Sequence, residues 1–183
     1  MILCIDLDNT LNNLQDAVIE RFNERYSTNY TIDNFRDYNI ENDISIDNAI
    51  LMKEMYIEQG IYNYVKPLRG AQKFIQKLIS NGHQVYIVTD SDPRIFDEKS
   101  KWIHTYFPAI DDAHIIAAKH KWMLRCDVMV EDCIDNLLGK PYYDRIVIDC
   151  PWNRDVHDYA YDIHRCYNFG QAMDVINKLN ELE

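Results

Sequence analysis

Residues 1–13 read MILCIDLDNTLNN, in which an apolar run leads directly into two aspartates, Asp6 and Asp8, separated by one residue. The continuous apolar and β-branched content of residues 2–7 is typical of a strand that is buried on both faces of a sheet. Carboxylates at the end of such a strand are costly unless they are paired, bind a metal or take part in chemistry. This stretch therefore predicts a buried strand that brings two functional carboxylates to one edge of a sheet.

The composition is that of an ordinary globular protein with a strong acidic excess. The 183 residues suffice for one well-buried domain with a small insertion, and 47% of them are hydrophobic. Thirty acidic and nineteen basic residues give a formal net charge of −11. This charge repels a phosphate polymer, so we expect no nucleic acid polymer as a partner. A small phosphorylated substrate remains compatible, because local basic groups and a metal ion outweigh a distant field.

The cysteines and the N-terminal residues indicate the cellular compartment of the protein. The five cysteines are odd in number and form no CxxC pair, which indicates reduced thiols in a cytoplasmic protein. The first residues lack the basic region of a signal peptide, and no apolar run approaches the roughly 18 residues of a membrane span. We therefore expect a cytoplasmic protein with no membrane partner. A homodimer is a possible assembly.

A mostly helical insertion follows the first strand. A helical pattern begins at Asn13, and a second helix is predicted over residues 46–58. Between Asn12 and Lys66 the chain has no proline, a single glycine and no convincing buried strand. We therefore expect two parts, an α/β core formed by residues 1–12 and 67–183 and a helical cap formed by residues 13–66.

The remainder alternates between helix and strand. Helical spacing recurs over residues 71–79, 96–106 and 170–183, and apolar runs predict strands over residues 84–90, 114–118, 127–132 and 144–149. Strands separated by helices predict an α/β fold with a doubly wound, Rossmann-like parallel sheet. In such sheets the working site lies at the carboxyl ends of the strands.

Polar side chains occur at the carboxyl ends of the predicted strands, where this rule places the working site. Four of the predicted strands end in carboxylates or a threonine, which parallel strands would bring to the same edge. These ends are Asp6 and Asp8, Thr89 and Asp90, Glu131 and Asp132, and Asp149.

Such a cluster of carboxylates needs a counter-charge, because its members cannot all be ionised together without one. Mg²⁺ is the natural partner, since it takes oxygen ligands and commonly holds a substrate phosphate as well. Thr89 is placed to donate a hydrogen bond to a phosphoryl oxygen. A lysine would complete the balance of charge, and both Lys119 and Lys121 precede the Glu131–Asp132 pair.

The same residues resemble the motifs of the haloacid dehalogenase superfamily of phosphohydrolases. IDLDNTL at residues 5–11 resembles its DxDxT signature, and VYIVT at residues 85–89 resembles its second motif, a strand that ends in Thr or Ser. Lys121, which precedes Glu131 by ten residues, resembles the third motif, and the Glu-Asp pair resembles the fourth. This resemblance implies a haloacid dehalogenase-type core, and its spacing favours Lys121 over Lys119.

Within the superfamily, the chain is most similar to the 5′(3′)-deoxyribonucleotidases and their bacterial and phage relatives. The similarity runs nearly end to end and includes the early cap, the segment at residues 67–89, EKSKWIHTYFP at residues 98–108, and PWN at residues 151–153, followed by Arg165. The resemblance implies a Mg²⁺-dependent phosphatase that hydrolyses nucleoside monophosphates, in particular deoxyribonucleotides, to nucleoside and phosphate.

The resemblance also implies a role for each matching residue. Asp6 would be the nucleophile that forms an aspartyl-phosphate, and Asp8 would be the general acid and base. Mg²⁺ would be held by Asp6, the backbone carbonyl of Asp8 and Asp132, with Glu131 supporting. Thr89 and Lys121 would bind the phosphoryl oxygens, and we expect Thr10, Asp90 and Leu14 on the substrate side.

Two positions depart from the family pattern. Asp90 stands where the mammalian-type enzymes carry a small hydroxyl residue, and Cys133 stands where they carry a basic residue. Both changes reduce the positive or neutral character near the phosphate, which leaves the preferred substrate open. The cap offers eight aromatic residues for stacking a base, although for any one of them packing within the cap is the better expectation.

Two alternatives fit the same residues. One is a phosphatase of the same superfamily that acts on another small phosphoester, such as a sugar phosphate or phosphoglycolate. The other is a non-catalytic phospho-receiver domain, which also uses clustered aspartates, Mg²⁺, a threonine and a lysine. A receiver, however, has an acidic pair at the end of its first strand rather than Asp-x-Asp-x-Thr followed by a cap.

Overall fold

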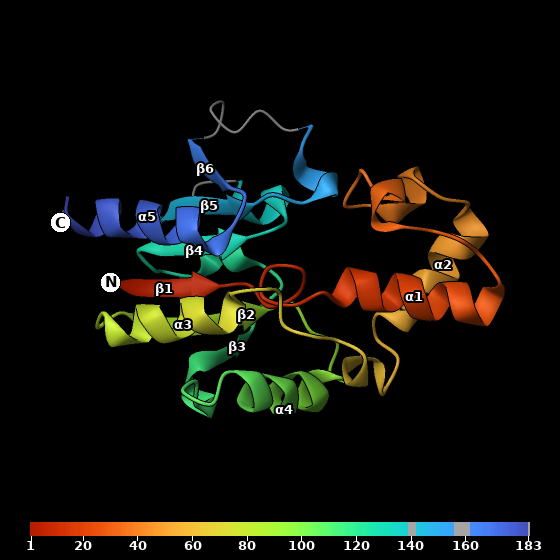
Figure 1. The fold of residues 1–183 in the computed structure, drawn as a ribbon, viewed down its shortest axis with the longest axis horizontal. Helices are drawn as coiled ribbons and strands as arrows, with labels where there is room; N and C mark the ends of the chain where they lie inside the picture. Colours follow the sequence, from red (N-terminus) through yellow and green to blue (C-terminus); the bar gives the residue numbers. More distant parts are fainter. Residues whose placement is uncertain (139–141, 156–161, 183) are drawn as a thin grey trace.

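The central sheet has six parallel strands in the order β3-β2-β1-β4-β5-β6 (Figure 1). This computed structural model describes residues 1–138, 142–155 and 162–182. The strand order changes direction between the neighbouring strands β1 and β4. In doubly wound sheets this point forms a crevice at the carboxyl ends of the strands, where ligands bind. The predicted α/β fold with a parallel sheet is therefore confirmed. The strands are β1 Ile2–Ile5, β2 Gln84–Thr89, β3 Ile115–Ala117, β4 Val128–Glu131, β5 Asp144–Ile148 and β6 Ile163–Cys166.

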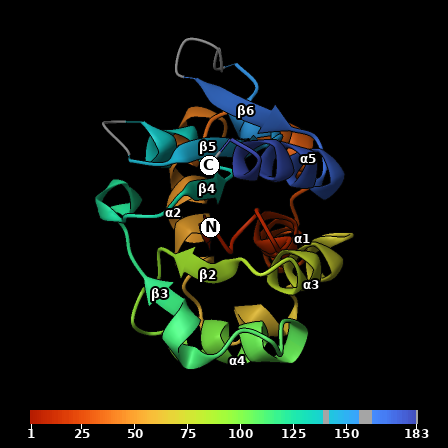
Figure 2. The same ribbon diagram turned by 90° about the vertical axis from the view of Figure 1, so that its left-hand side faces the viewer.

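Alternate residues of the central strands pack on opposite faces of the sheet, as the strand period requires. Leu3 and Ile5 of β1 belong to one apolar cluster, to which α3 (Ala71–Ser80), α4 (Phe96–Tyr106) and α5 (Phe169–Asn180) also contribute. Cys4, between them, belongs to a second cluster on the other face. Figure 2 shows α3 and α5 side by side along one face of the sheet. Burial on both faces explains why β1 reads as an uninterrupted apolar run.

The structure differs from the sequence-based expectation in two elements, the strand β6 and the helix α2. The strand β6 was not predicted, because its four residues IHRC lie at the edge of the sheet and only the first and the last of them are buried, so they form no apolar run. In the described part of the chain, the connection from β3 to β4 carries only a 3₁₀ turn, Lys121–Met123, and the turn after β4 is the 3₁₀ segment Ile134–Leu137. The second cap helix, α2, is Ile46–Met55 and therefore ends before residue 58.

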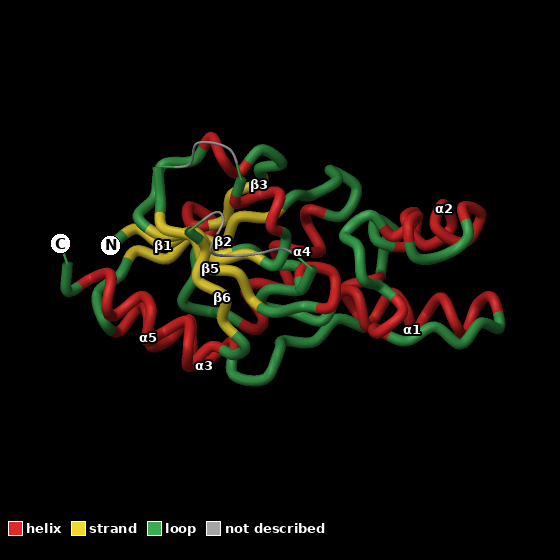
Figure 3. Tube along the Cα trace, turned by 90° about the horizontal axis from the view of Figure 1, so that it is seen from above, coloured by secondary structure: helices red, strands yellow, loops and turns green. Residues whose placement is uncertain are grey.

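The cap lies beyond the carboxyl ends of the strands, as Figures 1 and 3 show. It consists of α1 (Leu14–Tyr26), α2 and the short 3₁₀ segments Ile32–Asn34, Ile40–Asn42 and Ile61–Asn63. Its own core is apolar and fully buried, and it is continuous with the main cluster of the α/β core. Phe22 of α1 and Met52 of α2 are at the centre of this packing.

The two connections between cap and core are joined by backbone hydrogen bonds. Leu68 N–H donates to the carbonyl of Leu11 over 2.9 Å, and Asn13 N–H donates to the carbonyl of Lys66 over 3.1 Å. The side-chain oxygen of Asn13 accepts from Lys66 N–H over 2.7 Å, so it pins this crossing instead of capping α1. We propose that the boundary between the cap, residues 13–66, and the core falls at this pair of connections.

A substitution on the covered face of the sheet tests the packing of the core. Phe74 of α3 is buried and stacks on Phe169 of α5, with ring centroids 5.0 Å apart. We expect Phe74→Ala to lower the free energy of unfolding by about 3–5 kcal/mol, measured by urea denaturation. The exposed Gln76 of the same helix is the control, and we expect Gln76→Ala to change it by less than about 0.5 kcal/mol. Equal effects of the two substitutions would contradict this packing.

Candidate active site

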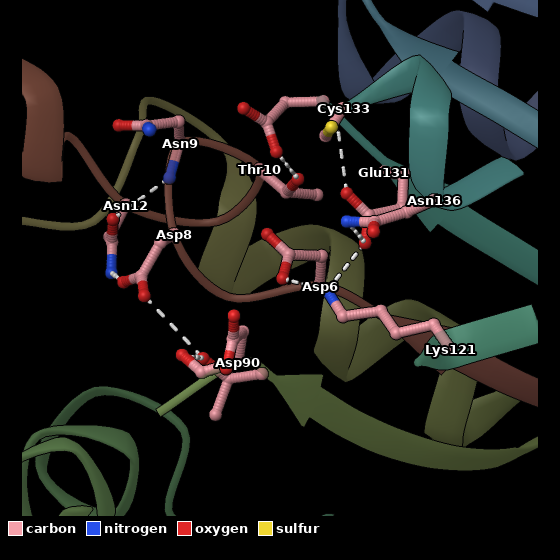
Figure 4. Close-up of polar contacts among 12 residues, drawn as sticks. Asp6, Asp8, Asn9, Thr10, Asn12, Asp90, Lys121, Glu131, Cys133 and Asn136 are labelled. Atoms are coloured by element: carbon pink, nitrogen blue, oxygen red, sulfur yellow. Dashed lines mark hydrogen bonds and ion pairs between the residues drawn. The ribbon is translucent and has the colours of Figure 1, made fainter. Parts of the chain in front are cut away.

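The loop after β1 is shaped by its own hydrogen bonds. Leu11 and Asn12 N–H groups both donate to the carbonyl of Leu7, over 2.9 and 3.2 Å, which folds the chain back at the end of the strand. Asn9 has a left-handed backbone, with φ of 62°, a conformation that asparagine tolerates better than most residues. The side-chain oxygen of Asn12 accepts from the N–H groups of Asn9 and Leu14 over 3.1 and 3.0 Å. This turn holds the Asp6 and Asp8 side chains at the sheet edge (Figure 4).

A buried lysine joins the ends of two strands. The Lys121 ammonium donates to Asp6, which follows β1, and to Glu131 at the end of β4, and all three side chains are buried. Glu131 also accepts from Cys133 N–H over 3.2 Å and from the Asn136 amide over 3.0 Å (Figure 4). Burial by itself lowers the pKa of Lys121, but the two carboxylates outweigh it and raise the pKa above its usual range.

The lysine does not balance the carboxylates around it. Burial raises the pKa of Asp6 to about 7, and Glu131 and Asp8 add to this rise against the pull of Lys121. Burial, Asp6 and Glu131 likewise raise the pKa of Asp132 well above its ordinary value. Oxygen atoms of Asp6, Glu131 and Asp132 lie within 4.8 Å of one another. A buried, oxygen-only donor set with surplus negative charge fits a hard divalent cation.

The Asp132 carboxylate is oriented from two sides. Trp152 Nε1–H donates to its Oδ2 over 3.0 Å, and the Thr10 hydroxyl donates to its Oδ1 over 3.4 Å. The Asn153 amide donates to the Asp132 carbonyl over 2.7 Å, so the PWN segment fixes both parts of this residue. Thr10 was expected on the substrate side, but it is fully buried against Asp132 and supports the acidic cluster instead.

Asp8 has a lysine of its own, which sequence reasoning missed. Lys99 of α4 is 3% exposed, and its ammonium donates to Asp8 Oδ2 over 2.7 Å, to the Thr89 hydroxyl over 3.0 Å and to the Asp90 carbonyl over 2.6 Å. Tyr62 O–H also donates to Asp8. Burial favours the neutral acid, but the Lys99 charge and these hydrogen bonds outweigh it and lower the pKa of Asp8. A sequence signal existed, because Lys99 shares the buried face of α4 with Trp102 and Ile103.

The two lysines that the sequence left as candidates are in different places. Lys121 is buried among the carboxylates, whereas Lys119 is exposed and lines the cavity in front of them. The structure therefore places Lys121, and not Lys119, in contact with Asp6.

A cavity of about 460 Å³ separates this edge of the sheet from the cap. Its floor includes Asp6, Asp8, Asp132, Lys99 and Lys121, and Asp90 and Leu14 also line it. Cys133 is buried, and its backbone contact with Glu131 is the role that the structure gives it. The cap side of the cavity combines the apolar and aromatic side chains of Leu14, Phe35, Tyr38, Ile40, Tyr56 and Ile57 with the polar side chains of Gln15, Asp37 and Lys53.

The other aromatic residues of the cap have structural partners. Phe22 packs against Tyr26 with ring centroids 4.6 Å apart, and Tyr30 meets the edge of Phe35 at 6.0 Å. Tyr64 lies under the Arg21 guanidinium, 4.3 Å from the ring centroid. Packing within the cap therefore accounts for part of the aromatic content that the sequence displays.

Solved structures of haloacid dehalogenase-like hydrolases share this fold. A haloacid dehalogenase-like family hydrolase from Streptococcus pneumoniae superposes with a TM-score of 0.65 over 96% of this chain and 97% of its own, at 14% identity. A predicted phosphatase from Clostridium acetobutylicum does so with a TM-score of 0.65 over 97% and 98%, at 13% identity. The fold is therefore that of the haloacid dehalogenase-like hydrolases.

The sequence identifies the family within this class. The family model described as 5′ nucleotidase, deoxy (Pyrimidine), cytosolic type C protein matches residues 1–180, and the chain belongs to this family of phosphomonoesterases. A 5′(3′)-deoxyribonucleotidase from Clostridium acetobutylicum is 26% identical over 155 residues, which are 83% of each chain. One from Bacillus subtilis is 26% identical over 102 residues, 55% of this chain and 58% of that one. The receiver-domain alternative is thereby set aside.

The ion pair between buried Lys99 and partly buried Asp8 makes a stability prediction. Lys99→Met leaves the Asp8 carboxylate, whose side chain is 18% exposed, without its cation, so we expect the free energy of unfolding to fall by about 1.5–3 kcal/mol. The exposed Lys101 of the same helix, which pairs with Asp97 at the surface, is the matched control. For Lys101→Met we expect a change below about 1 kcal/mol in the same urea titration. A harmless Lys99→Met would mean that this ion pair is not formed in solution.

The raised pKa of Asp6 predicts how metal binding depends on pH. The folded protein binds this proton more tightly than the unfolded chain, so without metal the Asp6 contribution to stability decreases as the pH rises from about 4 to about 7. A divalent cation competes with that proton. We therefore expect Mg²⁺ to raise the melting temperature more at pH 7.5 than at pH 5, relative to EDTA.

The isosteric variant Asp6→Asn is the control for this measurement, because its amide does not titrate. We expect its Mg²⁺-induced shift to be smaller and less dependent on pH than that of the unaltered protein. A Mg²⁺ effect of equal size at both pH values in the unaltered protein would contradict a cation site at Asp6.

Proposed function

We propose that this phosphomonoesterase is a Mg²⁺-dependent nucleotidase that hydrolyses deoxyribonucleoside monophosphates to nucleoside and phosphate. One observation carries the proposal, namely a single cavity with a charged floor at the sheet edge and a wall of mainly apolar and aromatic side chains from the cap. The volume of about 460 Å³ is in the usual range of small-molecule sites, roughly 300–1,000 Å³.

The chemistry assigned to the floor is a two-step phosphoryl transfer. In the first step an Asp6 oxygen attacks phosphorus, the bond to the nucleoside oxygen breaks, and Asp8 gives that oxygen a proton. In the second step Asp8 takes a proton from water, whose oxygen attacks phosphorus and displaces Asp6 as free carboxylate. The position of Asp6 and Asp8 two residues apart on one loop supports this division, because both side chains line the same cavity.

The metal and the donors around it would stabilise the charge that moves between these oxygens. Asp6, Asp132 and the Asp8 backbone carbonyl would hold Mg²⁺, with Glu131 supporting. When bound, Mg²⁺ supplies positive charge to the phosphoryl oxygens and helps to orient them. Thr89 and Lys121 would bind phosphoryl oxygens, and their place beside Asp8 and Asp6 supports that assignment.

The side chains on the cap side of the cavity indicate which leaving group fits there. A nucleobase is flat and apolar on its faces, which suits a wall of Phe35, Tyr56 and aliphatic side chains. A sugar phosphate carries several hydroxyl groups, each of which needs a polar partner once it is buried. Six of the nine cap residues that line the cavity are apolar or aromatic, and this majority favours a nucleotide over a sugar phosphate.

We also propose a cytoplasmic location. The description of the matching family contains the word cytosolic, and the five cysteines are all free. Within the described residues, no helix has the length and apolar character that crossing a membrane requires.

Phosphate release from a panel of phosphoesters tests the proposed function. The panel comprises deoxyribonucleoside and ribonucleoside monophosphates, phosphoglycolate and sugar phosphates, each with Mg²⁺ and with EDTA. We expect selective turnover of deoxyribonucleotides that EDTA abolishes. Asp6→Asn should lose at least about 10³-fold in kcat, because it removes the nucleophile.

The outcomes separate the candidates. Turnover confined to phosphoglycolate or sugar phosphates would agree with the proposed catalytic residues at the sheet edge and would exclude a nucleotidase. Activity that survives in Asp6→Asn would exclude Asp6 as the nucleophile.

A further inference from the structure

Gln15 lies in the first turn of α1 and lines the cavity beside Leu14. Its backbone N–H donates to the Asn9 side chain over 2.7 Å, and its side-chain Oε1 accepts from Tyr56 O–H. The residue is only 6% exposed, and its side-chain Nε2 is buried. Among the described residues, this Nε2 is the one buried side-chain polar atom without a hydrogen-bond partner.

A buried donor without an acceptor is unusual, because it has lost its contact with water and gained nothing in return. Of the cap residues that line the cavity with Gln15, Leu14 and Ile57 are apolar, and the Asp37 carboxylate makes no hydrogen bond to this Nε2. Tyr56 also lines the cavity, and its hydroxyl occupies the carbonyl end of the Gln15 amide. This contact fixes the orientation of the amide and leaves its NH₂ group for a partner that the chain does not supply.

We propose that Gln15 is a specificity-determining residue whose amide NH₂ donates to an acceptor oxygen on the nucleoside part of the substrate. The inference rests on the proposed function, since it requires a nucleoside in the cavity. A site built to make one hydrogen bond discriminates strongly against compounds that lack the matching group. The two kinds of acceptor that the test distinguishes are a carbonyl of the base and the 3′-hydroxyl of the sugar.

The test compares kcat/KM of the unaltered protein and Gln15→Met, which has similar length and no polar atom. The substrates are dUMP, 2′,3′-dideoxyuridine 5′-monophosphate, which lacks the 3′-hydroxyl, and 2-deoxyribose 5-phosphate, which lacks the base. We expect Gln15→Met to lose about tenfold on dUMP, the effect of one hydrogen bond. Gln76→Met, on the exposed face of α3, is the matched control and should leave all three values unchanged.

The two analogues identify the acceptor. If the base carbonyl is the acceptor, the loss persists on the dideoxy compound and disappears on 2-deoxyribose 5-phosphate. If the sugar hydroxyl is the acceptor, the loss disappears on the dideoxy compound and persists on 2-deoxyribose 5-phosphate. An equal loss on all three substrates would overturn the proposal, because it would depend on neither the base nor the 3′-hydroxyl.

Gln15→Met leaves the Tyr56 hydroxyl without its acceptor, which could itself disturb the fold. A second variant separates this effect from the loss of the contact to the substrate. Gln15→Met combined with Tyr56→Phe removes both polar partners, a change that is close to neutral for folding, and should show the same pattern of loss. If the unaltered protein hydrolyses dUMP and both variants match it, the inference about Gln15 fails and the proposed function stands. If the unaltered protein does not hydrolyse dUMP, the proposed function fails and the inference falls with it.

Discussion

The burial of the Lys121 ammonium between Asp6 and Glu131 is the constraint on which the site depends. A buried charge is tolerated only where its partners are close and well oriented, so these three residues must meet. The strand order satisfies this need, because β1 and β4 are neighbours and their carboxyl ends deliver Asp6 and Glu131 to one point. The 3₁₀ turn Lys121–Met123 brings the lysine to the same place. Topology and electrostatics are therefore linked through one side chain.

A second lysine gives the two aspartates of the loop opposite environments. Asp6 shares its lysine with Glu131 and lies near Asp132, and its pKa is raised to about 7. Asp8 has Lys99 to itself together with hydroxyl and amide donors, and its pKa is lowered. These directions describe the site without metal or substrate, and the proposed roles require the reverse, an ionised Asp6 and a protonated Asp8. A divalent cation at Asp6 would lower the pKa of Asp6, and a phosphate anion beside Asp8 would raise the pKa of Asp8. One of the donors to Asp8 is Tyr62, which belongs to the last 3₁₀ segment of the cap, so the cap also takes part in fixing this carboxylate.

The sequence predicted those parts of the structure that depend on local pattern. Buried parallel strands read as apolar runs, and polar residues at their ends marked the edge where Asp6, Thr89 and Glu131 meet. The strand β6 was not predicted from the sequence, because this edge strand is half exposed and has no continuous apolar run. The role of Lys99 was not predicted, because its partner Asp8 is 91 residues away in the sequence and only the packing of α4 brings the two side chains together. The partner of Gln15 is likewise set by the approach of α2, which no spacing along the chain records.

The departures from the family pattern have a physical consequence for the end of the cavity where we propose that the phosphate binds. Cys133 is buried and adds no charge, and Asp90 adds an acidic side chain to the lining. On the floor, the Lys121 and Lys99 ammonium groups are both already bonded to carboxylates. A phosphate dianion that enters this site therefore meets acidic groups whose charge the two lysines do not fully offset. Because like charges repel strongly where water is scarce, a divalent cation held by Asp6, Glu131 and Asp132, as proposed above, would allow the anion to bind. By the same reasoning, binding of the metal and binding of the phosphate should each favour the other.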